Sequence, residues 1–287
     1  MRIDDTTRRE AIALYDRFTH EGMERRTFMA RMVKLAGSLG ATELLIAGIA
    51  ASPAAATIIP EDDKRLTVGM QTIAGYKVYV AQPRTRSLKA TVLVIHENRG
   101  LNAHTRDVAR RIALAGYRAV APDMLTPAGG TPADEDAARD AIGRLDLAKS
   151  TADAVAMIDA LAKSSRGGKV GVVGFCWGGA FVNRLSVAAG DKLAGGVVYY
   201  GPAPDPAEAV RVQAPLLIHH AGLDQRVAQT LFPWVTALRA AGKRVTFHIY
   251  DGADHAFNND TSAERYNKLA ADLAWRRTLA FFRRTLR

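Results

Sequence analysis

The feature of this sequence that most constrains its fold is a glycine-rich corner around the single cysteine of the chain. Residues 174–179 read GFCWGG, after an apolar run over 169–173 and before a helix-like run over 180–189. A strand, a tight glycine turn and a helix form a nucleophile elbow, which holds one reactive side chain at a strained bend. The helix that follows also favours a thiolate at its N-terminus. The pattern predicts a reactive thiol at Cys176; the alternative is a buried, inert cysteine.

Two further residues follow the elbow in the order that a nucleophile, an acid and a base take in proteins with such an elbow. Strands are expected over residues 194–200, 214–221 and 244–250; Asp224 follows the second of them and His255 follows the third. Either residue alone is common in turns or packed interiors. Their position after successive strands predicts that both lie beside Cys176, where His255 moves protons and Asp224 orients it.

The rest of the chain alternates strands with helices. A β-branched apolar run over residues 90–95 predicts a strand buried on both faces, and a shorter strand is expected over 117–121. Helices are expected over 105–115, 146–162 and 262–285. This alternation predicts an α/β protein with a mostly parallel sheet flanked by helices. The seven histidines show no metal-ligand spacing, and we expect neither a metal ion nor a cofactor.

Together these motifs resemble the dienelactone hydrolase family, within the α/β-hydrolase superfamily. The resemblance covers roughly residues 60–287 and rests on HENRG at 96–100, GFCWGG, Leu223-Asp224, and GADHAF at 252–257. It implies an α/β-hydrolase fold and hydrolysis of an ester or lactone through a thioester acyl-enzyme. The residues that it assigns are a Cys176, His255 and Asp224 triad, Glu97 in contact with the resting cysteine, and oxyanion-hole amides of Trp177 and Asn98.

The family resemblance implies the reaction chemistry of this chain more directly than its substrate. Family members that act on dienelactone hold the substrate carboxylate partly with an arginine four residues after the catalytic histidine, where this chain has Asn259. An amide does not replace a bidentate guanidinium. We therefore take Arg99, Phe257 and Asn259 as candidate substrate contacts, with Arg139 and Arg144 as other sources of a cation.

The alternatives to a dienelactone hydrolase are a broad carboxylesterase or a thioesterase, which use the same chemistry, and a redox-sensing thiol on a hydrolase scaffold. The net charge of +10 does not favour nucleic-acid binding, because the basic residues are scattered. In the last helix the arginines are expected to face solvent, opposite an apolar stripe. The expected partner is a small-molecule ester or lactone, and both a monomer and a homodimer are compatible with the sequence.

Residues 1–56 differ from the hydrolase domain expected over 57–287. The run ERRTFM at 24–29 resembles a twin-arginine export motif, and residues 35–51 are moderately apolar. Small residues at 52–56 fit a cleavage site, and cleavage there would leave 231 residues in the periplasm. The alternative is a cytoplasmic protein that retains a helical extension packed on the domain. Because Glu43 interrupts the apolar stretch, no permanent membrane span is expected.

Overall fold

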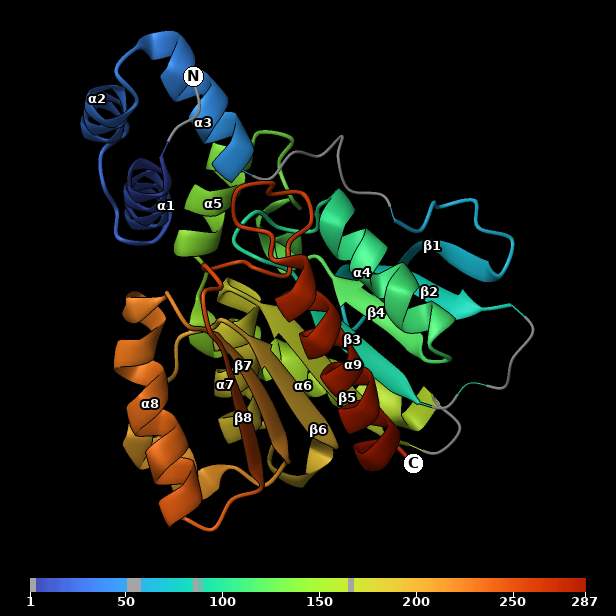
Figure 1. Ribbon diagram of the computed structural model, residues 1–287. Coiled ribbons are helices and arrows are strands. Elements are labelled where there is room, and N and C mark those ends of the chain that lie inside the picture. Colours follow the sequence, from blue (N-terminus) through green and yellow to red (C-terminus); the bar gives the residue numbers. More distant parts are fainter. Residues whose placement is uncertain (1–3, 51–57, 85–87, 89, 165–167) are drawn as a thin grey trace.

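The computed structural model describes residues 4–50, 58–84, 88, 90–164 and 168–287. At its centre lies one eight-stranded sheet with the order β1-β2-β4-β3-β5-β6-β7-β8 (Figure 1). Strands β3 to β8 run parallel, and β2 runs antiparallel to both β1 and β4. The strands are β1 (Leu66–Ile73), β2 (Tyr76–Pro83), β3 (Thr91–Ile95), β4 (Arg118–Pro122), β5 (Val170–Phe175), β6 (Gly195–Tyr199), β7 (Leu216–Ala221) and β8 (Val245–Tyr250).

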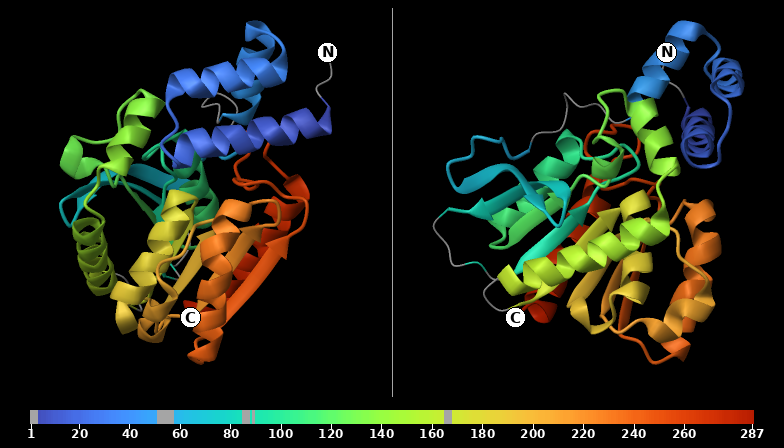
Figure 2. Two further views of the ribbon diagram at one scale, coloured as in Figure 1. Left: turned by 90° about the vertical axis from the view of Figure 1, so that its left-hand side faces the viewer. Right: turned by 180° about the vertical axis from the view of Figure 1, so that it is seen from behind.

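Helices cover both faces of this sheet (Figure 2). α4 (Ala103–Leu114) and α9 (Lys268–Thr285) share one apolar core with the sheet. On the other face, α6 (Leu147–Ser164), α7 (Trp177–Ala188) and α8 (Gln225–Ala240) share a second core. The shorter helical segments are α5 (Glu135–Gly143), η2 (Thr126–Ala128), η3 (Gly190–Lys192) and η4 (Pro206–Arg211). Because both faces are covered, the side chains of β3, β5, β6 and β7 are all buried, as the apolar runs predict.

The six strands expected from the sequence are all present, but two features differ. The antiparallel pair β1 and β2 was not expected, because β1 is half exposed and lacks an apolar run. The last helix begins at Lys268 rather than at Ser262, since Asn267 caps it by accepting a hydrogen bond from the Ala270 amide. Residues 262–267 instead form a loop, in which the Ser262 hydroxyl donates to the Ile49 carbonyl.

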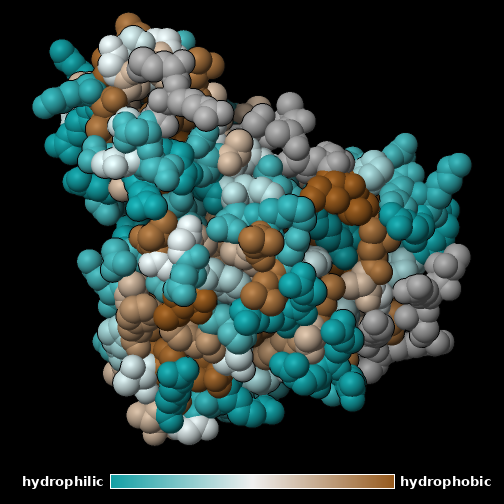
Figure 3. Space-filling model, viewed as in Figure 1, coloured by the Kyte–Doolittle hydropathy of each residue, from teal (hydrophilic) through white to brown (hydrophobic). Residues whose placement is uncertain are grey.

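The N-terminal residues form a small helical bundle that we call the cap: α1 (Asp5–His20), α2 (Arg25–Ala36) and α3 (Leu39–Ile49). The cap has an apolar core of its own, in which Phe18 stacks on Phe28. In Figures 1 and 2 the cap lies beyond one edge of the sheet, over the loops that follow the parallel strands. On the face shown in Figure 3, hydrophilic colours dominate and the hydrophobic residues are scattered in small groups.

In the described part of the chain, no helix is by itself long and apolar enough to cross a membrane. Helices α2 and α3, which are bent by 107° relative to each other, reach that length and apolarity only when they are taken together. The residues at 52–56 that resemble a cleavage site lie outside the described residues.

Candidate active site

Cys176 lies in the strained turn between β5 and α7. Its φ is 54°, in the left-handed region that non-glycine residues rarely adopt. A Cβ on Gly174 would lie 2.1 Å from the Gly178 carbonyl oxygen, and one on Gly178 would lie 2.5 Å from the His96 carbonyl oxygen. Only glycine fits at both positions, so the expected elbow is present. The Cys176 amide is held by the Tyr199 carbonyl at 3.0 Å.

His255 and Asp224 meet at this thiol. Nε2 of His255 lies 3.2 Å from Sγ of Cys176, and its Nδ1 lies 2.5 Å from Oδ2 of Asp224. Asp224 follows β7 and caps α8 by accepting from the Val227 amide at 3.1 Å. His255 lies in the loop after β8. All three side chains are buried, so carboxylate, imidazole and thiol form one continuous chain shielded from bulk water.

Burial and charge pairing act in opposite directions on the protonation of Asp224 and His255. Burial opposes charge on both residues, but each offers the other a counter-charge and a hydrogen bond. As a result the pKa of Asp224 is lowered and the pKa of His255 is raised well above its usual value. His255 therefore holds a proton at neutral pH, and Asp224 stays ionised beside it.

The raised pKa of His255 predicts a pH-dependent contribution to stability. A raised histidine pKa stabilises the folded state fully below the unfolded pKa of about 6.5, and this stabilisation is lost as the pH rises through the folded value. We therefore expect His255→Asn to lower Tm most in acid and progressively less above about pH 6.5. His248→Asn should show the opposite trend, because burial lowers the pKa of His248. A His255→Asn penalty that grows with pH in thermal melts would contradict this assignment.

The loop after β3 brings Glu97, Asn98 and Arg99 to the same place. The Glu97 carboxylate accepts from the Tyr200 hydroxyl at 3.3 Å and from Nδ2 of Asn259 at 2.9 Å. Among the described residues it makes no hydrogen bond with Cys176. The contact with the resting cysteine that the family resemblance implies therefore stays a prediction, while the carboxylate is hydrogen-bonded to Tyr200 and Asn259.

The candidate substrate contacts separate into two groups. Arg99 lines the cavity at Cys176, whereas Phe257 and Asn259 are fully buried and do not line it. Phe257 packs against Tyr200 and Tyr250 in the core, which differs from the expected substrate contact. Neither of the other two arginines supplies a cation to this cavity. Arg139 pairs with Asp136 and Asp140 at the cap interface, and Arg144 is exposed at the end of α5.

The cap contributes side chains that the sequence did not identify. The cavity at Cys176 is lined by Tyr15, Thr19 and His20 of α1. Nε2 of His20 lies 3.8 Å from Sγ of Cys176. Burial lowers the pKa of His20 well below its usual value, so its ring is neutral. No local motif marks these residues, because their place in the site depends on distant parts of the chain: His20 and Cys176 are 156 residues apart. The cavity measures only about 30 Å³, room for one or two water molecules.

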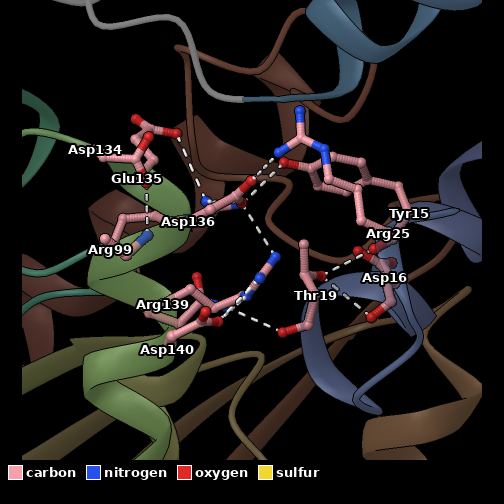
Figure 4. Close-up of polar contacts among 12 residues, drawn as sticks. Tyr15, Asp16, Thr19, Arg25, Arg99, Asp134, Glu135, Asp136, Arg139 and Asp140 are labelled. Atoms are coloured by element: carbon pink, nitrogen blue, oxygen red, sulfur yellow. Dashed lines mark hydrogen bonds and ion pairs between the residues drawn. The ribbon is translucent and has the colours of Figure 1, made fainter. Parts of the chain in front are cut away.

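Polar contacts hold α1 and α2 against α5 and the loop after β3 (Figure 4). Arg25 pairs with Asp136 at 2.7 Å, and Arg99 pairs with the same carboxylate at 3.2 Å while donating to the Tyr15 hydroxyl. Behind this network the Asp16 carboxylate lies 3.3 Å from a buried guanidinium nitrogen of Arg265. Each cation that lines the small cavity is therefore already paired with a carboxylate.

Two larger pockets flank α1. One of about 610 Å³ lies between the cap and α5 and includes Phe18, Phe28 and Arg99 in its lining. The other, about 450 Å³, includes Asp224 and His255. Helix α1 lines all three spaces, and the cavity of about 30 Å³ at the thiol is far smaller than the two pockets of ligand size.

Comparison with known proteins agrees with this architecture. The model of the "Dienelactone hydrolase family" matches residues 76–286. A relative from Escherichia coli (strain K12), named "Putative carboxymethylenebutenolidase", is 31% identical over 255 residues, which cover 82% of this chain and 93% of the relative. One of the same name from Saccharolobus solfataricus is 31% identical over 248 residues, covering 74% of this chain and 95% of the relative.

A solved structure is similar over the same region. The "Putative Dienelactone Hydrolase" from Klebsiella pneumoniae superposes with a TM-score of 0.69 at 27% identity, covering 76% of this chain and 98% of that one. The mixed sheet flanked by helices has the α/β-hydrolase fold. The matched region holds the elbow, Asp224 and His255. This chain belongs to the dienelactone hydrolase family and is a carboxylic ester hydrolase that acts on ester or lactone bonds.

Proposed function

We propose that the chain hydrolyses its substrate through Cys176 as nucleophile, with His255 and Asp224 as its partners. Sγ attacks the ester or lactone carbonyl carbon, and the His255 imidazolium gives its proton to the departing alkoxide oxygen. This leaves a thioester on Cys176. Water, deprotonated by His255, then attacks the thioester, and the thiolate leaves as the carboxylic acid product forms.

The same proposal assigns the oxyanion to backbone amides. The Trp177 amide opens α7 directly after the nucleophile, and the Asn98 amide belongs to the loop after β3. Two such amides stabilise a tetrahedral oxyanion, each by about 3 kcal/mol or more. The N-terminal end of α7 adds a favourable field at the same point. Glu97 is proposed to hold Tyr200 and Asn259 in the resting site and to turn toward Cys176 when substrate arrives.

This proposal rests on one observation. At a strained elbow, Sγ of Cys176 lies 3.2 Å from Nε2 of His255, and Nδ1 of His255 lies 2.5 Å from Oδ2 of Asp224. The test is turnover of a p-nitrophenyl ester by the wild-type and Cys176-substituted proteins, with a search for the thioester by mass spectrometry. The arrangement also disfavours a mere redox sensor, since a sensor needs no carboxylate behind its histidine.

The substrate class follows from the thiol. A thiolate leaves readily from a tetrahedral intermediate, so lactones and activated esters should react in preference to amides. The Asn259 side chain donates a hydrogen bond to Glu97 and accepts one from the Thr261 hydroxyl, and it offers no cation to a substrate carboxylate. Dienelactone itself is therefore not assigned, and a broad carboxylesterase or thioesterase remains the alternative.

Catalysis on any ester requires the cap to move, because the cavity of about 30 Å³ cannot admit one. We expect Asp16→Asn, which leaves the buried Arg265 without its carboxylate, to favour the open cap. Alkylation of Cys176 by iodoacetamide should then become about 10 to 100 times faster, in line with about 1–3 kcal/mol of lost docking energy.

A matched control is available on the same helix. Glu21 pairs with Arg17 on the exposed side of α1, so Glu21→Gln should leave the alkylation rate unchanged. If Asp16→Asn is alkylated as slowly as the wild type, the ion pair with Arg265 does not hold the cap closed.

The cellular location stays a prediction of the sequence. In the cap, Arg25 of the twin-arginine run is paired with Asp136, an arrangement that suits the alternative of a retained helical extension. Were export and cleavage after Ala56 to occur, the mature protein would lose Tyr15, Thr19 and His20 from its site. The two locations therefore imply differently covered active sites.

A further inference from the structure

The cap brings a second histidine to the thiol, and the mechanism proposed above does not use it. Nε2 of His20 and Nε2 of His255 approach the Cys176 sulfur from two elements far apart in sequence, at 3.8 and 3.2 Å. These three atoms all lie within 4.8 Å of one another. The two rings are 5.1 Å apart between centroids and inclined by 66°, so they are not stacked face to face.

We propose that His20, Cys176 and His255 form a binding site for a divalent transition-metal ion, with zinc as the best fit, that closes the cap on the active site. Zinc prefers thiolate and imidazole ligands, at about 2.3 Å to sulfur and 2.0–2.1 Å to nitrogen. In a tetrahedral site such ligands lie about 3.3–3.6 Å from one another. The two sulfur-to-nitrogen distances observed here, 3.8 and 3.2 Å, bracket this spacing.

The surroundings of the three ligands also suit a metal. Asp224 already holds Nδ1 of His255, the carboxylate–histidine pairing that orients metal-bound imidazoles. Glu97 adds a carboxylate to the lining of the cavity, and Arg99 and Arg265 are paired with other carboxylates. The volume of about 30 Å³ accommodates the ion and one water molecule as a fourth ligand.

Metal binding would release one proton and would block the active site. The metal forms bonds to Sγ of Cys176 and to Nε2 of each histidine, and the proton shared between His255 and the thiol leaves to solvent. The nucleophile is then blocked and α1 is tied to the elbow. Zinc should thus inhibit hydrolysis reversibly and reduce the opening of the cap at the same time.

The experiment measures zinc binding to the full chain without turnover. Competition with a chromophoric chelator should give one tight site in the wild type, and His20→Asn should weaken it by at least about 10-fold. Cobalt in place of zinc should show a thiolate-to-metal charge-transfer band that Cys176→Ser abolishes. His248→Asn, a substitution on β8 outside the site, should bind zinc like the wild type.

Two further readouts test the role of the cap. Zinc should slow amide hydrogen exchange in α1 of the wild type but not of His20→Asn, and His20→Gln serves as a second variant if the first is poorly folded. Zinc binding of equal affinity in the wild type and both His20 variants would overturn the proposal, as would binding that leaves α1 exchange unchanged. Because binding and exchange need no substrate, failure of the proposed hydrolysis would leave these results unaffected.

Discussion

Replacing Cys176 by alanine is expected to lower kcat/KM for a p-nitrophenyl ester by at least about 10,000-fold. The substitution removes the atom that forms the thioester, so the oxyanion amides and His255 have no covalent step to assist. The wild type should show a mass increase of one acyl group after rapid quenching, and Cys176→Ala should show none. The measurement is steady-state hydrolysis combined with intact-protein mass spectrometry.

The control must separate chemistry from folding. Cys176→Ala removes one small buried atom, so its Tm should stay close to that of the wild type. Ser186→Ala, a matched small change further along α7, removes only a hydrogen bond to the Asn183 carbonyl and should keep nearly full activity. If Cys176→Ala retained more than about a tenth of the activity, a nucleophile elsewhere would have to be sought.

The second large effect is expected at the elbow glycine. Gly174→Ala would place a methyl group 2.1 Å from the Gly178 carbonyl oxygen and 2.9 Å from Val182. Both contacts are far inside van der Waals distance, and one is with backbone that cannot rotate away. We expect the free energy of unfolding to fall by about 3–5 kcal/mol, with loss of activity as the elbow shifts.

Gly69→Ala is the matched control for this change. Gly69 lies in β1, and nothing lies within 4 Å of the Cβ it would carry. Chemical denaturation should therefore show a change within about 0.5 kcal/mol for Gly69→Ala. Equal stabilities of the two variants would show that β5 and α7 can separate at Gly174, contrary to the close packing described.

The residues that could be predicted from sequence are those whose role is local. The β-branched runs predict the central parallel strands because a strand covered on both faces must be apolar throughout. The elbow glycines predict the position of Cys176. Asp224 and His255 can be predicted beside it because the loops that follow parallel strands lie at the same end of the sheet. Strand β1 was not predicted because its half-exposed residues show no comparable apolar pattern.

The rest of the site depends on contacts between distant parts of the chain. His20 and Asp16 belong to a polar helix whose sequence resembles any solvent-exposed helix, and only docking places them at Cys176 and Arg265. Phe257 and Asn259 lie near His255 in sequence, which favoured them as substrate contacts. A chain reversal at Ala256, with φ of 65°, precedes both, and they lie in the core.

The position of the cap before the sheet in the sequence has a consequence for assembly. During synthesis α1 to α3 emerge before the strands, yet Arg8 donates a hydrogen bond to the Glu264 carbonyl and Ile49 accepts one from Ser262, each more than 200 residues later. The bundle can form its own interior early but can dock only once the last loop exists. We expect docking to be the final folding event and local undocking to cost far less than global unfolding. A newly made molecule would thus have an open active site before its first closure.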